Sequence, residues 1–321
     1  MAVLITGSMG HAGFELVRQS VQRGMAVVAQ YRDTFREADA KALGGTVRWV
    51  RCDLTDDADL KSLLDGADID GCIHTAAIPN ELYCRPAPLN AVRTNTGAVA
   101  SLLEAARRRN WRRFIYVSTG SVFQNADTSK PVFEDAQQAV TNVYSTTKYC
   151  GELLTSMYRS QFEISAATVR ISWVYGPPLV PKERENPRGP IPYFLKCALM
   201  GKPVREPSGG DFAASFTHVS DVAGGLLAAY EAPSLGYDAY HLGSGVNYTT
   251  RDVVRAIKSA VPDAEIEVGA GTAPWTDHTR MRGPLAGDRL LNDTGWRPRL
   301  SLEDGIRSFA EWMRAHPEVL Q

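Results

Sequence analysis

The chain has 321 residues, of which 44% are hydrophobic and 22% charged, and its formal charge at pH 7 is −1. This length corresponds to roughly two average domains, and the composition excludes a disordered, collagenous or coiled-coil protein. A balanced charge offers no broad basic face for phosphates, so we expect no nucleic-acid partner.

The cysteines and the apolar segments predict the compartment. The five cysteines are odd in number and no two form a C-x-x-C pair, so we expect reduced thiols and no disulfide framework. Strand-like sequence begins at Ala2, which leaves no room for a secretion signal, and no apolar run approaches the ~20 residues of a membrane span. His74 and His218 belong to no spaced ligand cluster, so we predict a soluble, cytoplasmic protein without a bound metal or a membrane partner.

The first half of the chain alternates short apolar strands with amphipathic helical stretches. Ala2–Thr6 is a compact apolar strand, and a helical pattern then runs from about His11 to Arg23. Further strands are predicted at Met25–Gln30, Thr46–Arg51, Ile69–His74, Phe114–Ser118 and Ser165–Ile171, and helices near Asp56–Leu64, Ala91–Arg109 and Thr141–Ser160. Strands that are apolar at nearly every residue and separated by helices indicate an α/β fold with a doubly wound parallel sheet of the Rossmann type.

The pattern becomes irregular after the last of these strands. Gly176–Pro192 carries six prolines and a charge cluster, which is typical of a linker or of an ordered loop that covers a substrate pocket. We favour the pocket loop, because a helix is predicted directly after it. The later predicted elements are helices at Tyr193–Met200, Asp221–Ala232, Thr249–Ala260 and Ser301–Ala315, and a strand at Tyr240–Gly243.

The turn between the first strand and the first helix predicts a dinucleotide site. Glycines three residues apart let the chain turn sharply and let backbone N–H groups approach a pyrophosphate at the positive end of the helix. The spacing is T-G-x-x-G-x-x-G, a variant of the better-known G-x-G-x-x-G. The residues expected to bind the cofactor here are Gly7, Met9, Gly10, His11, Ala12 and Gly13.

The end of the second strand bears on the choice between NAD and NADP. A carboxylate at this place accepts hydrogen bonds from the ribose 2′-hydroxyl, whereas an arginine pairs with a 2′-phosphate. If the strand ends at Gln30, Tyr31 takes the usual acid position and Arg32 is free to meet a phosphate. If the chain is displaced by two residues, Asp33 serves NAD instead. We favour NADP slightly, and keep NAD as the alternative.

Two further segments carry the residue types of proton transfer beside a nicotinamide. Tyr144 and Lys148 stand four residues apart, on one face of a predicted helix. Free tyrosine, with a pKa of about 10, is a poor base at neutral pH, but a nearby ammonium stabilises its phenolate. Ser118 and Thr119 end the fifth predicted strand, where a hydroxyl faces the crevice that binds ligands in such sheets.

In this combination and order the motifs resemble the extended short-chain dehydrogenase/reductase superfamily and its NAD-dependent epimerase/dehydratase family. The resemblance covers almost the whole chain, including His218-Val219-Ser220-Asp221-Val222 and Gly295-Trp296-Arg297-Pro298. It implies that Thr119, Tyr144 and Lys148 form the catalytic set. It also implies cofactor contacts from Tyr144 and Lys148 and from a further group of residues: Asp53, Leu54, Ala76, Ala77, Asn95 and Ser172.

The same resemblance implies two domains and a dimer. The dinucleotide-binding domain would comprise 1–170, with about 214–245 returning to it. The smaller substrate domain would comprise 171–213 and 246–321. A homodimer would form through two long helices, near 91–109 and 142–160.

Departures from the family pattern bear on the substrate. Gly120 and Ser121 stand where the related 4,6-dehydratases have Asp-Glu, which disfavours dehydration. Trp173 replaces an asparagine of the 4-epimerases, and Ala214 replaces an arginine that meets the substrate diphosphate. Other arginines are available as replacements: Arg188, Arg205, Arg280 and Arg282. The candidate substrate residues are Ser118, Thr119, Ser121, Trp173 and Arg282.

We therefore predict an enzyme that moves hydride between NAD or NADP and a secondary alcohol or ketone of a sugar-like substrate. It would act as an epimerase or as a net dehydrogenase/reductase. The chain shares features with both 4-epimerases and dTDP-4-dehydrorhamnose reductases, and a substrate without a nucleotide is credible. The alternative is a non-catalytic NAD(P)-binding sensor that regulates a protein partner.

Overall fold

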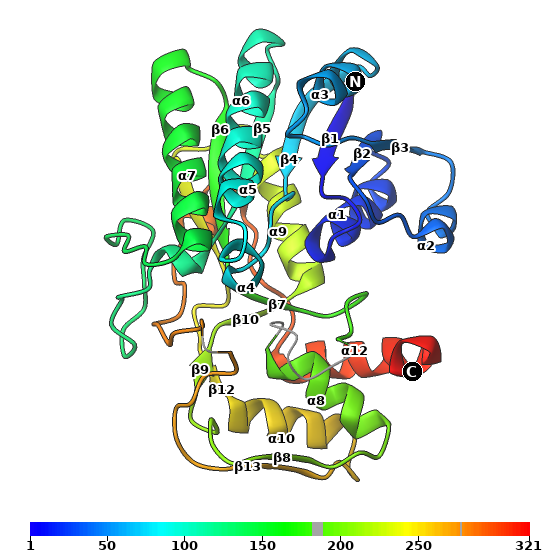
Figure 1. The fold of residues 1–321 in the computed structure, drawn as a ribbon, viewed down its shortest axis with the longest axis vertical. Helices are drawn as coiled ribbons and strands as arrows, with labels where there is room; N and C mark the ends of the chain where they lie inside the picture. Colours follow the sequence, from blue (N-terminus) through cyan, green and yellow to red (C-terminus); the bar gives the residue numbers. More distant parts are fainter. Residues whose placement is uncertain (182–188, 277) are drawn as a thin grey trace.

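A seven-stranded parallel sheet organises the larger part of the molecule (Figure 1). The computed structural model describes residues 1–181, 189–276 and 278–321. In spatial order the strands of the sheet are β11 (Ala239–Leu242), β6 (Ala166–Ile171), β5 (Arg113–Thr119), β4 (Ile69–His74), β1 (Ala2–Thr6), β2 (Val27–Tyr31) and β3 (Val47–Arg51). The doubly wound sheet predicted from the alternation of strands and helices is thereby confirmed.

Helices cover both faces of this sheet, which explains why its central strands carry apolar residues in near-continuous runs. One face is covered by α1 (His11–Gln22), α9 (Val219–Glu231) and α11 (Arg289–Thr294). The other face is covered by α3 (Asp57–Asp65), α6 (Ala98–Arg108) and α7 (Val143–Phe162). All seven residues of β5 are buried between the two helical layers.

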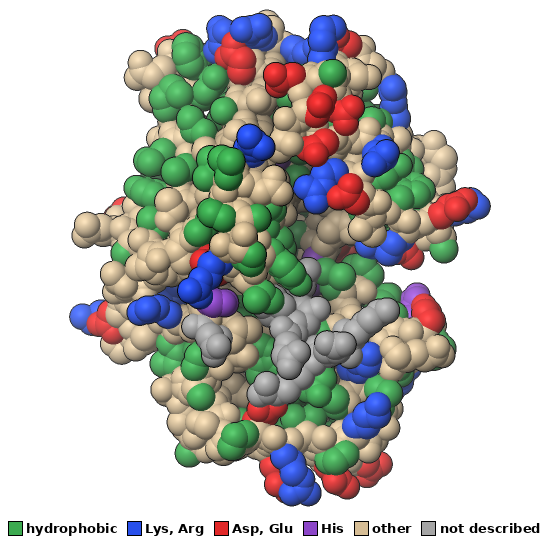
Figure 2. Space-filling model, viewed as in Figure 1, with side chains coloured by type: hydrophobic (Ala, Val, Ile, Leu, Met, Phe, Trp, Pro, Cys, Tyr) green, Lys and Arg blue, Asp and Glu red, His purple; other side chains and the backbone are tan. Residues whose placement is uncertain are grey.

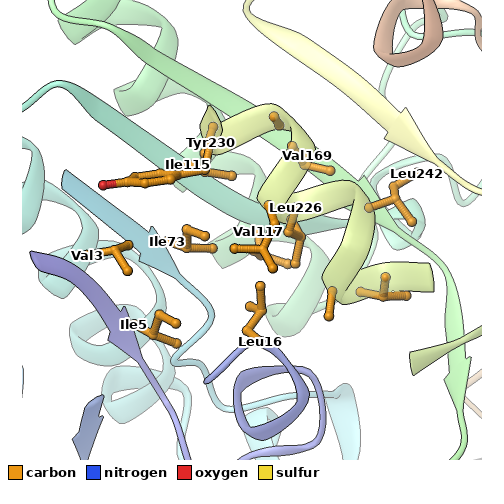
Figure 3. Close-up of a cluster of buried hydrophobic side chains, with 14 of the residues drawn as sticks. Val3, Ile5, Leu16, Ile73, Ile115, Val117, Val169, Leu226, Tyr230 and Leu242 are labelled. Carbon is orange, nitrogen blue, oxygen red and sulfur yellow. The ribbon is translucent and has the colours of Figure 1, made fainter. Parts of the chain in front are cut away.

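The core on the α1 side joins segments that are distant in the sequence. Leu16 of α1 and Leu226 of α9 both approach the sheet at Ile73 and Val117 (Figure 3). All four residues are at most 6% exposed, and fully burying a side chain of this size contributes about 1.5–3 kcal/mol. This packing holds α1, and therefore the turn before it, firmly against the ends of β1 and β4.

The predicted helix near Ala91–Arg109 is interrupted in the structure. A π-helical turn at Arg93–Gly97 separates α5 (Pro88–Val92) from α6. The remaining short segments of the first half of the chain are α2 (Glu37–Ala42), α4 (Glu81–Cys84) and the 3₁₀ turn Gly120–Val122. Single π turns inside α-helices often occur at functional sites, and this one contains Asn95.

A smaller group of elements lies beyond the carboxyl ends of the strands, below the sheet in Figure 1. Its core gathers residues such as Phe194, Ile257, Ile306 and Phe309, each fully buried. The elements are β7 (Trp173–Tyr175), α8 (Pro190–Leu199), β8 (Val204–Glu206), β9 (Ala213–Ala214), β10 (Phe216–His218), β12 (Tyr248–Thr249), α10 (Thr250–Ala260), β13 (Ile266–Val268), α12 (Leu302–Ala315) and the 3₁₀ turn Pro317–Leu320. Between β10 and β12 the chain returns to the sheet as α9 and β11.

The proline-rich stretch is more regular at its end than predicted. The helix expected from Tyr193 begins at Pro190, so both Pro190 and Pro192 lie in the first turn of α8. Proline fits there because the first N–H groups of a helix have no partner within the helix. Residues 182–188 of the predicted pocket loop lie outside the described residues.

Candidate active site

A cavity of 1270 Å³ opens at the carboxyl ends of the sheet strands, between the sheet and the smaller group of elements. On the face shown in Figure 2, the surface is hollowed between these two parts of the molecule. Almost every residue predicted for the site lines this cavity. They are Gly7, Met9, Gly10, His11, Ala12, Gly13, Tyr31, Arg32, Asp53, Leu54, Ala76, Ala77, Ser118, Thr119, Ser121, Tyr144, Lys148, Ser172, Trp173 and Arg282.

The glycine turn has a shape that side chains would destroy. Gly7 has φ +63°, and a Cβ placed on Gly13 would lie 2.2 Å from the carbonyl oxygen of Gly7. The Gly7 N–H donates to Oε1 of Gln30 at 2.9 Å, and Nε2 of Gln30 donates to the Cys52 carbonyl at 2.6 Å. Gln30 therefore braces the turn from β2, a role that its place in the sequence did not reveal. The open cradle before α1 fits a pyrophosphate.

The end of β2 bears on the alternative left open by the sequence. The strand continues to Tyr31, so Tyr31 and not Asp33 occupies the strand end. Arg32 follows it and pairs with Asp33 at 2.6 Å, with about half of the Arg32 side chain exposed. Sequence reasoning missed Arg36, which also lines the cavity and donates to the Met9 carbonyl at 2.7 Å.

Asn95, expected to contact the cofactor, does not line the cavity. Its Oδ1 accepts from the Ile78 N–H at 2.8 Å, and its Nδ2 donates to Thr147 Oγ1 at 3.1 Å. The side chain is 1% exposed, because the π turn directs it between the Ile78 segment and α7. In this arrangement Asn95 supports the cavity wall from behind, and its contact with the cofactor stays a prediction.

His74 is buried and bonded within the protein at the strand ends. Its Nδ1 lies 2.8 Å from Thr6 Oγ1 at the ends of β4 and β1. Burial lowers the pKa of His74 to about 3, so the ring is neutral at physiological pH. Thr6 Oγ1 also accepts from the Thr75 and Ala76 N–H groups, at 3.1 and 3.2 Å.

Thr119, Tyr144 and Lys148 all line the cavity. Thr119 ends β5, and its Oγ1 accepts from the Ser121 N–H at 3.1 Å. Tyr144 lies in the first turn of α7, where its N–H donates to Glu81 Oε2 at 2.9 Å. One turn further along α7, the ammonium of Lys148 donates to the Val117 carbonyl at 2.7 Å. Burial lowers the pKa of Lys148 to about 7.

Ser118 points to a different neighbour from its companion Thr119. Its hydroxyl donates to Glu152 Oε1 at 2.5 Å, and Glu152 forms a buried ion pair with Arg170 at 2.7 Å. Glu152 was not predicted as a site residue. This network stiffens the ends of β5 and β6 and engages the Ser118 hydroxyl within the protein.

The replacements proposed for the missing diphosphate arginine lie in different places. Arg282 and Arg280 line the cavity. Arg205 is 71% exposed and pairs with Glu267 on the surface of the β8–β13 pair, away from the cavity. Arg188 lies outside the described residues. Ala214 is buried where β9 pairs with β12.

This arrangement defines a class of protein: a dinucleotide-binding α/β enzyme with a tyrosine, a lysine and a hydroxyl at the mouth of the cofactor crevice. Residues 3–243 match the NAD dependent epimerase/dehydratase family, and the chain belongs to that family. The predicted family, and with it a nicotinamide-dependent enzyme of the extended short-chain dehydrogenase/reductase type, is confirmed. None of the helices in the described parts of the chain is long and apolar enough to cross a membrane.

Curated relatives are similar along nearly the whole chain. The UDP-glucose 4-epimerase of Mycolicibacterium smegmatis is 28% identical over 328 residues, which cover 98% of this chain and 99% of that enzyme. A trifunctional UDP-glucose 4,6-dehydratase/UDP-4-keto-6-deoxy-D-glucose 3,5-epimerase/UDP-4-keto-L-rhamnose-reductase of Arabidopsis thaliana is 27% identical over 98% of this chain. The chain spans about half the length of that plant relative, 47%.

The fold also matches solved structures. The UDP-glucose 4-epimerase of Thermotoga maritima, crystallised with UDP-glucose, superimposes with a TM-score of 0.86. The match covers 99% of this chain and 100% of that enzyme, at 20% sequence identity. A likeness at this identity shows the two-part fold. The substrate must be inferred from the residues of this chain.

Proposed function

We propose that the protein transfers hydride at a secondary alcohol or ketone of a sugar-like substrate, with Tyr144, Thr119 and Lys148 as its catalytic residues. The observation that carries this proposal is that all three line the cavity that begins at the glycine turn. The bound dinucleotide would supply the hydride acceptor or donor. Tyr144 would take the hydroxyl proton of the substrate or return it, while Thr119 Oγ1 hydrogen-bonds the same oxygen.

Lys148 would have two tasks. Its ammonium would donate to the hydroxyls of the cofactor ribose, and its positive charge would favour the phenolate form of Tyr144. The Val117 carbonyl, 2.7 Å from the ammonium, holds the side chain in place for both tasks.

For the cofactor we propose NADP over NAD. The cradle of Gly7 and Gly13 fits the pyrophosphate of either dinucleotide. NADP is supported by β2, which ends in Tyr31 and is followed by Arg32, so that an arginine stands where a 2′-phosphate would lie. Asp53 and Leu54, which line the same end of the cavity, would contact the adenine.

The substrate and the outcome of the reaction are also part of the proposal. The named relatives act on nucleotide-linked sugars. This chain has Trp173 and the buried Ala214 at two positions where the resemblance to 4-epimerases implies polar residues that contact the substrate. We therefore propose a sugar-like substrate without a nucleotide. The enzyme would act on it either as an epimerase or as a net dehydrogenase/reductase.

The decisive experiment replaces Tyr144 by phenylalanine. Purified protein is loaded with NAD or NADP, and hydride transfer to a panel of sugars, sugar acids and sugar nucleotides is followed by absorbance of the reduced nicotinamide and by product stereochemistry. Tyr144→Phe should lose at least about a hundredfold in turnover and keep its cofactor affinity. Near-normal turnover would refute the proton role. Cofactor binding by the wild type with no turnover across the panel would favour the sensor.

We further propose a homodimer formed through the outer face of α7 and its neighbour α5. Leu153 and Met157 of α7 are 52% and 38% exposed, and Leu89 and Val92 of α5 are 63% and 47% exposed. Such an apolar surface is typical of a subunit contact. Light scattering should give twice the chain mass, and Leu153→Glu should give the monomer.

The domain division and the compartment remain proposals too. The return of 214–245 to the nucleotide-binding part is supported by β11, which pairs with β6, and by α9, which packs on α1. The five cysteines are free, which fits a reducing compartment such as the cytoplasm.

A further inference from the structure

Arg282 places a guanidinium at the reacting end of the cavity. Its Nη2 donates to Ser172 Oγ at 3.3 Å, beyond the end of β6. On the other side it lies over Gly120, where an added Cβ would be 3.0 Å from Nη2 and 3.1 Å from Nε. Gly120 directly follows Thr119 in the chain, so the guanidinium lies at the strand end that carries the hydroxyl we propose as a catalytic group.

The backbone around Arg282 is held from several sides. Asn247 Nδ2 donates to the Arg282 carbonyl at 2.7 Å, and the Gly283 N–H donates to the Asp127 carbonyl at 3.2 Å. A Cβ on Gly283 would lie 1.6 Å from the Lys130 carbonyl oxygen, so only glycine allows this approach. The side chain of Arg282 is therefore presented to the cavity by a loop with a defined position.

The charge of Arg282 has no carboxylate partner among the described residues, since none lies within ion-pair distance. The side chain is half-buried and faces the cavity. Loss of solvent lowers its pKa to about 10, and Tyr144 partly opposes this shift. A cation in such surroundings gains most from an anion that enters the cavity.

A neighbouring space is mostly apolar, and Glu206 is the charged residue among the described residues that line it. A second pocket of 140 Å³ adjoins the cavity at Trp173 and Trp275, which line both. Its walls include Phe194, Phe212 and Phe216. Among the residues that the structure describes, no lysine or arginine lines this second pocket. The anion is therefore expected beside the reacting carbon rather than in this neighbouring space.

We propose that Arg282 binds a carboxylate on the substrate, one or two carbons from the carbinol that reacts, so that the substrate is a free sugar acid. The inference rests on the proposed hydride transfer and adds its substrate class. In the oxidation, the carbinol C–H bond breaks and its hydride passes to NAD(P)⁺, while the hydroxyl proton passes to Tyr144. Arg282 keeps its protons throughout and holds the carboxylate by two parallel N–H···O bonds.

The test compares matched substrates on the cofactor-loaded enzyme. Galacturonate is paired with galactose, gluconate with glucitol, and UDP-glucuronate with UDP-glucose, each with NAD⁺ and NADP⁺. The free acids should have kcat/KM at least about a hundredfold above their neutral partners, because a site built for a charged group rejects the analogue that lacks it.

Variants assign this preference to Arg282. Arg282→Gln should lower kcat/KM for the acids by about a hundredfold, mainly through KM, so that the preference for acids over their neutral partners is lost. Arg282→Lys should lose less than Arg282→Gln, because lysine keeps the positive charge but cannot form the two parallel hydrogen bonds of a guanidinium. Arg205→Gln, an exposed arginine away from the cavity, is the matched control and should leave the acid preference unchanged. Unaltered NADPH binding shows that each variant is folded.

Other outcomes overturn the inference. It fails if neutral sugars are preferred, or if UDP-sugars are turned over and Arg282→Gln impairs them, since Arg282 would then serve a diphosphate. If no sugar reacts, tartronate is titrated into the NADP⁺-loaded enzyme by calorimetry. Binding that Arg282→Gln abolishes supports the inference, and an absence of binding to the wild type refutes it.

The two proposals fail in different ways. If Tyr144→Phe loses turnover of an acid but still binds tartronate, both proposals stand. If it retains turnover, the proton role of Tyr144 is wrong while the carboxylate site at Arg282 is unaffected. If turnover depends on Tyr144 but the acid preference is absent or survives Arg282→Gln, only the inference about Arg282 is wrong.

Discussion

The ammonium of Lys148 lies 2.7 Å from the carbonyl oxygen of Val117 and 4.2 Å from the centre of the Tyr116 ring. Lys148 is 3% exposed, so its charge is separated from water by the strand and helix that hold it. This explains why burial lowers its pKa to about 7. The geometry that prepares the ammonium for a cofactor therefore reduces the stability of the cofactor-free protein.

Replacing Lys148 by methionine should stabilise the cofactor-free protein in a pH-dependent way. Because the folded pKa is lowered, the cost of burying the charge is fully present below pH 7 and decreases as the pH rises towards the ordinary value of 10.5. We expect Lys148→Met to raise Tm by roughly 2–6 °C at pH 6, with a smaller gain at pH 9.5. Thermal unfolding of both proteins at these two pH values measures the difference.

The control for this prediction is Lys41→Met, because Lys41 is 75% exposed and pairs with Glu37 on the surface. Its effect on Tm should be small at both pH values. A Tm of Lys148→Met that is lower than that of the wild type at both pH values would show that the buried charge is not a source of instability.

The buried pair of Arg170 and Glu152 should be costly to break from either side. Their side chains are 4% and 6% exposed, and Glu152 also accepts from Ser118. Removing one partner leaves an uncompensated buried charge, so Arg170→Met should lower the free energy of unfolding by about 3–5 kcal/mol. The double variant with Glu152→Met should recover part of this loss. Urea denaturation of the four proteins gives the coupling, and strictly additive losses would contradict it.

Gly13→Ala should impair dinucleotide binding because its Cβ would meet the Gly7 carbonyl oxygen at 2.2 Å. Backbone atoms of the turn must move to relieve this contact, which changes the cradle before α1. We expect at least a tenfold weaker affinity for NAD(P)H, about 1.4 kcal/mol, measured by fluorescence titration. Gly97→Ala, whose Cβ would have only an ordinary contact at 3.9 Å with the Val92 carbonyl, should bind normally. Equal affinities for the two variants would argue against this cradle.

Arg32→Gln should reduce the preference for NADP without disturbing the glycine turn. If Arg32 meets the 2′-phosphate, its loss should weaken NADP⁺ binding about tenfold or more and leave NAD⁺ binding nearly unchanged. Calorimetric titration with both dinucleotides separates these effects. Arg48→Gln, a change at an arginine on the neighbouring strand β3, serves as the control. A wild type that binds NAD⁺ more tightly, with no change in Arg32→Gln, would assign the cofactor as NAD.

Much of the fold was predictable because its signals are local. The strand of Ala2–Thr6, the glycine turn and the start of α1 follow from residues adjacent in the chain. Element ends were less predictable: β2 continues one residue beyond Gln30, and α8 includes two prolines assigned to an irregular stretch. The end of β2 was decided by the pairing of Tyr31 with β3. The start of α8 was decided by the first turn of a helix, which accepts proline.

The candidate site was predicted in its residue types but not in its supporting contacts. Gln30 braces Gly7, and Glu152 engages Ser118, although neither residue belongs to a motif with a recognisable spacing. Asn95, which is expected at the cofactor, also supports the cavity wall through Ile78, a contact that the sequence did not indicate. The direction of a side chain in such cases depends on how distant elements pack together. The periodicity of the sequence gives no information on that packing.

By itself the sequence determined the doubly wound sheet, the dinucleotide turn and the tyrosine and lysine of one helix, since each depends on neighbours within a few turns of chain. Only the tertiary structure decided that Arg282 lies over Gly120 and beside Ser172. These residues come from three distant segments, and their approach follows from how the smaller group of elements packs against the strand ends. The position of the Arg282 charge next to the end of β5 is therefore a result of that packing.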